Sequence, residues 1–325
     1  MIVPASLLER RLHFVAGKGG VGKTTMAAAL ALLLVRRGRR TLAVEMEGPG
    51  RLAALLGATQ PAHGPVEIVP GLHVLAVDGR AALEEYLALV IPVKRLLSTI
   101  FSSKIYQYFV AAAPGLKELM TIGKIWYEAT RRDGDRPAWD AIVVDAPATG
   151  HSLQYLRMPQ AARETFGAGL VQREATKIVD LLRDPATTTV HLVTLAEEMP
   201  VAETLEMRQQ LVDSLRLPLG HVIVNRVHRR RFAPAPLERL RAATGEARPL
   251  LACVAERAAE ENGWAEINAA YLARLRAEIG DASLVEVPFL FVEEFGLAQV
   301  EQMSRVLAAS VPGGETAARR RTRSR

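Results

Sequence analysis

A glycine-rich segment with two lysines is the strongest chemical signal in the sequence. It reads Gly17-Lys18-Gly19-Gly20-Val21-Gly22-Lys23-Thr24-Thr25 and matches the pattern G-x-x-x-x-G-K-[ST]. Glycines let successive backbone amides turn toward one point and surround phosphate oxygens, and a following helix adds its positive end. In this arrangement Lys23 reaches the β- and γ-phosphates, and the Thr24 hydroxyl binds Mg²⁺. The segment therefore predicts a site for ATP and Mg²⁺.

The second lysine of this segment, Lys18, is not needed to bind nucleotide within one chain. One interpretation is a charged residue in a solvated loop. The other is a lysine that crosses a dimer interface to the partner's nucleotide, as an arginine finger does. The second interpretation predicts a homodimer in which Lys18 and Lys23 are both catalytic.

An aspartate follows a separate apolar run, Ala141-Ile-Val-Val-Asp145. A nucleotide loop of this kind needs an acidic residue at the end of a neighbouring strand, where it steadies the water shell of the Mg²⁺. Asp145 is the residue predicted for that role. The next residues, Ala146–His151, form a loop rich in turn formers, which is suited to sensing whether the γ-phosphate is present.

Positioning these residues requires a sheet, and short apolar runs alternate with helical patterns along the chain. The runs are apolar on both faces, which is typical of parallel strands covered by helices on both sides. The predicted helices include Thr24–Arg37 and Val201–Leu215. The pattern predicts an α/β fold with a doubly wound, mostly parallel sheet. The predicted strands are Leu12–Ala16, Thr41–Glu45, His73–Val77, Ala141–Val144, His191–Leu195, His221–Val224 and Leu284–Val287.

Two regions interrupt this alternation. Residues from about 81 to 132 have a strand-free helical pattern with apolar and aromatic residues at helical spacing, which predicts a helical subdomain. That stripe is either ordinary core or dimer contact, or a groove for an apolar partner helix. Residues 311–325 are rich in Gly, Ala, Thr and Arg and are expected to be a disordered basic tail. The expected organisation is therefore one domain over residues 1–310, followed by the tail.

Composition narrows the function classes. Hydrophobic residues make up 49% of the 325 residues and charged residues 23%, which excludes a chain that is disordered as a whole. The net charge of +6 suggests nucleic acid or anionic membrane, but five arginines and no acid lie in the last nine residues. Without them the chain has 36 basic and 35 acidic residues, so contact with nucleic acid or anionic lipid is expected, at most, from the tail.

A single cysteine, Cys253, excludes an internal disulfide and a multi-cysteine metal site within one chain, so no zinc is expected. The longest uninterrupted apolar run, Met26–Val35, is ten residues and too short to cross a bilayer. No secretory signal pattern precedes Phe14. These features predict a cytoplasmic protein.

Several segments, in order along residues 11 to about 300, resemble those of one family. The nucleotide loop with its extra lysine resembles the deviant Walker A loop of dimeric ATPases, and the match is closer to the arsenite-pump and tail-anchored-protein targeting members. The other segments that resemble these members are Asp145-Ala-Pro-Ala-Thr-Gly-His-Ser-Leu-Gln-Tyr-Leu-Arg-Met-Pro159, Ala113-Pro-Gly-Leu-Lys-Glu118, Val222-Ile-Val-Asn225 and Val287-Pro288-Phe289. The resemblance implies that Asn225 reads adenine and that Pro288 and Phe289 pack on the base.

The chain also departs from that family pattern. The family's first switch carries an aspartate that orients the attacking water, whereas Glu45-Met-Glu-Gly-Pro-Gly-Arg-Leu52 puts Glu47 at that place. A glutamate reaches about one methylene further, so Glu47 either still acts as the base or leaves hydrolysis slow, and Glu45 is a nearby competitor for the role. The cysteines through which some members bind zinc or arsenite are absent, and the chain has one nucleotide loop where pump members usually have two.

The resulting prediction is a Mg²⁺-dependent ATPase that works as a nucleotide-sandwiched homodimer. Its conformational switch would act on a protein client or a membrane partner. The main alternative is a nucleotide-gated binding module whose ATP-bound dimer holds DNA or anionic membrane. An arsenite pump subunit and a small-molecule kinase are disfavoured, the latter because such kinases do not need a lysine at position 18.

Overall fold

The computed structural model describes residues 7–46, 50–59, 64–90, 101–104, 106, 108, 113, 115–243, 247–280 and 282–310. Three of the predictions above fall outside these residues. They concern Glu47, the tail over 311–325 and the middle of the segment 81–132. The domain boundaries drawn from the sequence also stay a prediction.

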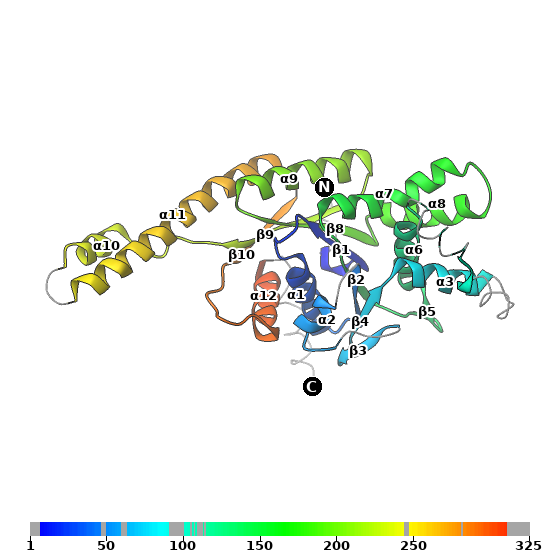
Figure 1. Ribbon diagram of the computed structural model, residues 1–325, viewed down its shortest axis with the longest axis horizontal. Helices are drawn as coiled ribbons and strands as arrows, with labels where there is room; N and C mark the ends of the chain where they lie inside the picture. The colour runs from blue at the N-terminus through cyan, green and yellow to red at the C-terminus, as the bar shows by residue number, and fades with distance from the viewer. Residues whose placement is uncertain are drawn as a thin grey trace, which may run out of the picture.

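An eight-stranded sheet forms the centre of the described structure (Figure 1). Its strand order is β10-β9-β8-β1-β7-β2-β4-β3, and every neighbouring pair is parallel except β3 with β4. The predicted doubly wound, mostly parallel sheet is confirmed, and the seven predicted strands are all present. The antiparallel edge strand β3 was not predicted. The strands are β1 Leu12–Gly17, β2 Thr41–Met46, β3 Val66–Val69, β4 Leu72–Val77, β7 Ala141–Asp145, β8 Thr188–Leu195, β9 Leu219–Val227 and β10 Ser283–Pro288.

Helices cover both faces of this sheet because the strands are apolar on both sides. One face packs on α1 (Lys23–Arg36), α2 (Arg51–Leu55) and α12 (Leu297–Ser310). The residues of α1 from Met26 to Leu34 are all buried, as expected for a helix that is apolar all round. The other face packs on α6 Leu116–Thr130, α7 Thr149–Thr165, α8 Leu170–Arg183, α9 Glu198–Gln209 and the end of α11 Arg248–Glu278.

The chain between β9 and β10 forms a helical arm. Helix α10 (Pro234–Arg241) packs against the first part of α11, and both extend away from the sheet (Figure 1). The far end of α11 returns to the body, where Leu272 and Leu275 are buried in the core beneath α9. The sequence patterns did not predict this arm, because its exposed helices lack a strong apolar period. Among the described residues, no helix is both long and apolar enough to cross a membrane.

The region expected to be a helical subdomain contains α3 (Gly79–Val90) and α6, which pack on each other. Lys124 of α6 donates to Glu85 of α3 at 2.6 Å, and α6 also contacts α7. A small hairpin of β5 (Arg132–Asp133) and β6 (Arg136–Pro137) follows. The described part of this region is therefore helical up to that hairpin.

Three buried histidines stack across adjacent strands at the centre of the sheet. His13 of β1 and His191 of β8 have ring centroids 5.5 Å apart, and His191 and His221 of β9 lie 5.4 Å apart. A hydrogen bond of 3.2 Å joins His13 Nδ1 to His191 Nε2, and His191 Nδ1 accepts from the backbone N–H of His221 at 3.1 Å. Burial lowers the pKa of His13 to about 3 and that of His221 to about 4. Burial also lowers the pKa of His191 well below its usual value, so all three rings are neutral in the folded protein at neutral pH.

The three stacked histidines make the stability of the folded protein depend on pH. Below pH 6.5 the unfolded chain takes up protons that the folded histidines refuse, so the free energy of unfolding falls as the pH falls toward 4. At pH 5 each such histidine costs about 2 kcal/mol relative to neutral pH. We expect His221→Leu to remove the part of this loss in unfolding free energy that His221 causes. Leucine should be tolerated there, because neither ring nitrogen of His221 has a hydrogen-bond partner among the described residues. Urea unfolding of both proteins at pH 5 and 7.5 measures the difference, and equal pH slopes would contradict the assignment.

Candidate functional site

The glycine-rich loop lies at the carboxyl end of β1 and leads directly into α1, as the sequence predicted. Two of its glycines are required by close approach. A Cβ on Gly17 would lie 2.2 Å from the Val193 carbonyl oxygen of the neighbouring strand, and one on Gly22 would lie 2.3 Å from Asn225 Nδ2. Gly22 also has φ of 95° at the start of α1, a left-handed conformation that glycine adopts without strain. The backbone amides of this loop and the first turn of α1 therefore lie where the sequence predicts the phosphate site.

Both lysines of the loop are held by contacts within the chain. Lys23 Nζ donates to the backbone carbonyl of Lys18 at 3.0 Å, and burial lowers the pKa of Lys23, which nearby Asp145 partly offsets. Lys18 Nζ pairs with Glu203 Oε1 of α9 at 2.5 Å. In this structure the amine of Lys18 therefore contacts α9 of its own chain, while Lys23 lies near the predicted metal-binding residue Asp145.

Asp145 ends β7, which lies between β1 and β2 in the sheet. Its carboxylate accepts a hydrogen bond from the Thr24 hydroxyl, so the two residues predicted to hold Mg²⁺ meet. Burial raises the pKa of Asp145 to about 7; Thr24 and Lys23 oppose the rise and Glu45 adds to it. Asp145 Oδ1 has no hydrogen-bond partner in the part of the chain that the structure describes. A buried acceptor without a partner fits a water of a Mg²⁺ shell.

Glu45, the alternative to Glu47 as the predicted base, forms hydrogen bonds to the backbone of its own chain. Its two carboxylate oxygens accept the backbone N–H groups of Arg51 at 3.0 Å and Leu52 at 3.4 Å. These bonds hold the start of α2, and burial raises the pKa of Glu45. Glu45 is therefore engaged with backbone, whereas the structure leaves the place of Glu47 undescribed.

The residues implied for adenine lie near the carboxyl ends of the paired strands β9 and β10. Asn225 Nδ2 donates to the Val21 carbonyl of the glycine-rich loop at 2.9 Å, and its Oδ1 accepts from the Arg226 N–H at 2.9 Å. Phe289, next to Pro288, stacks on His228 with centroids 4.6 Å apart. His228 in turn contacts the Glu261 carboxylate of α11 at 2.9 Å. No sequence spacing pointed to His228 or Glu261, since α11 reaches this place only through the arm.

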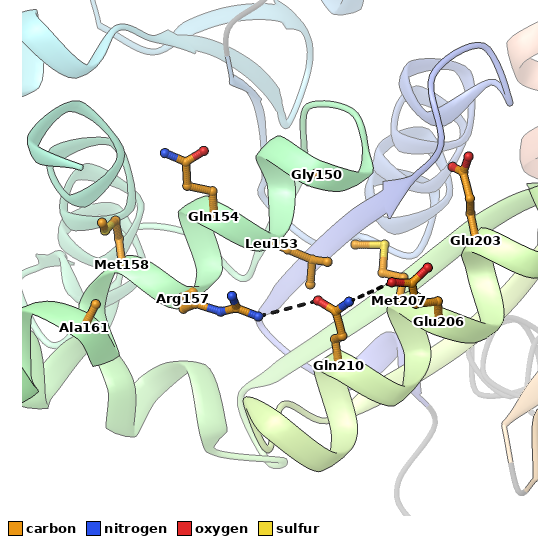
Figure 2. Close-up of a pocket in the computed structure, with 10 residues that line it drawn as sticks. All are labelled: Gly150, Leu153, Gln154, Arg157, Met158, Ala161, Glu203, Glu206, Met207 and Gln210. Atoms are coloured by element: carbon orange, nitrogen blue, oxygen red, sulfur yellow. Dashed lines mark hydrogen bonds between the residues drawn. The ribbon is translucent and has the colours of Figure 1, made fainter. Parts of the chain in front are cut away.

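A groove of about 660 Å³ separates α7 from α9 (Figure 2). Leu153, Met158 and Met207 give it an apolar lining, and Arg157 faces Gln210 across it at 3.5 Å. Glu203, the partner of Lys18, also lines this groove. The groove adjoins the predicted metal site because α7 begins at Thr149, four residues after Asp145. It adjoins the glycine-rich loop because Glu203 contacts Lys18. Sequence reasoning missed Glu203, which no motif marks.

Comparison with known proteins gives the family of this chain. A family model described as Anion-transporting ATPase matches residues 10–174. The chain is 38% identical to the ATPase BagA of Mycobacterium tuberculosis over 229 residues, which is 69% of this chain and 67% of that protein. The chain belongs to the anion-transporting ATPase family. The resemblance stated from the motifs is thereby confirmed, and so is the prediction of an ATPase of this family.

Two further relatives match this chain at lower identity. Protein Rv2184c of Mycobacterium tuberculosis is 27% identical over 330 residues, covering 89% of this chain and 73% of that protein. An arsenical pump-driving ATPase of Escherichia coli is 28% identical over 240 residues, 66% of this chain but 39% of that protein. The family model spans the glycine-rich loop, Asp145 and all of α7, whereas Glu203, Asn225 and Phe289 lie beyond it.

Proposed function

We propose that this chain hydrolyses ATP in the cytoplasm as a Mg²⁺-dependent homodimer with the nucleotides held between its subunits. The observation that carries the proposal is the meeting of Lys23, Thr24 and Asp145 at one edge of the sheet, with Asp145 Oδ1 left without a partner among the described residues. This arrangement offers a cation for phosphate, a hydroxyl for the metal and an acceptor for the metal's water. When bound, Mg²⁺ neutralises phosphate charge and orients the phosphates for attack by water.

The chain's own residues bind the phosphates, orient the attacking water and bind the adenine. Lys23 leaves the Lys18 carbonyl to pair with the β- and γ-phosphates, and the loop amides from Gly19 to Thr25 hold their oxygens. Glu47 orients the attacking water as the base of the first switch. Asn225 exchanges its present backbone partners for the adenine edge, and Phe289 packs on the base beside Pro288. Lys18 crosses to the partner's γ-phosphate.

Hydrolysis in this proposal drives a conformational switch. The loop after Asp145 senses the γ-phosphate and continues into α7, so a change at the phosphate moves the wall of the groove between α7 and α9. The helical region 81–132, which contacts α7 through α6, is the surface proposed to handle a protein client or a membrane partner. The pump-driving names of some relatives favour a membrane partner.

The test is the molar mass of the full chain by light scattering, with and without ATP and Mg²⁺, alongside phosphate release. We expect the mass to double with ATP and Mg²⁺, and the turnover per chain to rise with protein concentration through the dimerisation range. A chain that stays monomeric at full turnover would overturn the sandwiched dimer. Absence of Mg²⁺-dependent phosphate release would overturn the ATPase.

The titration of Asp145 predicts a pH dependence for nucleotide binding. Protonation removes the negative charge of the carboxyl and makes it a weaker acceptor for the water shell of Mg²⁺, and the pKa of Asp145 is raised to about 7. We expect the affinity for Mg²⁺-ATP to be constant above pH 7 and to fall about tenfold per pH unit below it. Fluorescence titration with a labelled ATP from pH 5.5 to 8 measures this. The matched control is Asp145→Asn, which cannot titrate, and an identical pH profile in both proteins would refute the role of Asp145.

A further inference from the structure

An ion pair joins the glycine-rich loop to α9. Lys18 Nζ lies 2.5 Å from Glu203 Oε1, and the two side chains are 31% and 32% exposed. We infer that Glu203 is a positioning residue that holds Lys18 against its own chain until the ATP-bound dimer forms. This inference rests on the proposed function, because it concerns the state that precedes the crossing of Lys18.

Lys18 is restrained at both of its ends. Its backbone carbonyl accepts from Lys23 Nζ at 3.0 Å, and its amine pairs with Glu203. When Lys23 turns to the phosphates, the first restraint is lost, and the ion pair is then the contact that still directs Lys18 toward α9. ATP binding and release of Lys18 are therefore coupled through one residue of the loop.

The strength of the pair suits a releasable restraint. Because both side chains are partly exposed, water screens the attraction, and pairs of this kind contribute little to stability. The γ-phosphate of the ATP bound to the partner subunit carries more negative charge than one carboxylate. In the dimer this phosphate is therefore able to replace Glu203 as the ion-pair partner of Lys18. The position of Glu203 in the groove beside α7 also links the pair to the helix that follows the metal-site aspartate.

The chain offers a matched control on the same helix. Glu206 lies one turn after Glu203 and lines the same groove, and its carboxylate accepts from Gln210 Nε2 at 3.2 Å. Glu206→Gln therefore makes the same change of charge in the same groove while leaving Lys18 paired. The variant that conserves the charge at the position itself is Glu203→Asp.

The first measurement is the reactivity of the Lys18 amine in the full chain without nucleotide. An amine-acylating reagent is added, and the modified peptide is quantified by mass spectrometry. We expect Glu203→Gln to raise the rate at Lys18 by about 1.5- to 5-fold, the range set by the strength of exposed pairs. Glu206→Gln is expected to leave the rate at Lys18 unchanged. An unchanged rate in Glu203→Gln would overturn the ion pair itself.

The second measurement is the protein concentration at half-maximal ATP-dependent dimerisation. Each dimer gives up two pairs, so Glu203→Gln is expected to lower this concentration by about 2- to 30-fold. Glu203→Asp is expected to fall closer to the original protein, and Glu206→Gln to match it. Raised Lys18 reactivity with unchanged dimerisation would overturn the positioning role. Failure of the original protein to dimerise with ATP would instead overturn the proposed function, while the reactivity result would still report on the pair.

Discussion

Replacing Lys18 with alanine is expected to lower kcat for ATP about 10³-fold, at the lower end of the effect of an arginine finger. The amine of Lys18 is paired with Glu203, whereas Lys23 is the lysine whose charge acts on Asp145. ATP binding to the single chain should therefore change by only a few fold. The loss arises in the transition state, because the charge that Lys18 supplies to the partner's γ-phosphate is missing. Phosphate release and light scattering with ATP measure the two effects.

Mixing two inactive variants makes this result specific to a dimer. A Lys18→Ala subunit keeps its own Lys23, and a Lys23→Ala subunit still offers Lys18 to its partner. A mixed dimer therefore contains one complete site, and an equal mixture is expected to recover about a quarter of the original activity. No recovery on mixing, with each variant alone able to dimerise, would show that Lys18 acts within its own subunit. Full turnover and dimerisation by Lys18→Ala alone would exclude the crossing lysine.

Lys23→Ala is expected to lower kcat by about 10²- to 10³-fold and to weaken ATP binding as well. Lys23 differs from Lys18 because its side chain is desolvated, which lowers its pKa, and because it lies near Asp145. Its charge is therefore available to the phosphates in both the bound state and the transition state. Lys23→Arg is not expected to rescue the activity, since a planar, forked guanidinium does not reproduce the compact point charge of an ammonium.

The stability of the Lys23→Ala variant separates catalysis from folding. Burying an ammonium is unfavourable, so removing it should leave Tm unchanged or higher. Loss of activity with a preserved Tm would locate the effect in the site. A Tm lower by several degrees would mean that Lys23 mainly supports the loop, and kcat values would then have to be corrected for unfolded protein.

Much of the site was predictable because its chemistry is local. Nine consecutive residues supply the glycines, the lysines and the hydroxyl of the phosphate loop, and an apolar run ending in Asp145 marks a neighbouring strand. The apolar strands also indicated a parallel sheet, since each must be buried on both faces. The edge strand β3 escaped prediction because it is short and partly exposed, so its burial pattern lacks that signal.

The partners of these residues were decided only by the tertiary structure. Parallel neighbouring strands place whatever follows each of them at the same edge of the sheet, and β8 lies beside β1. For that reason α9, which follows β8, brings Glu203 to Lys18 across 185 positions of sequence. The same strand order brings Asn225 against the loop and stacks His13, His191 and His221. The sequence by itself predicted which residues bind phosphate and metal. The order of strands in the sheet determined which side chains hold those residues, because pairing between distant strands leaves no local sequence pattern.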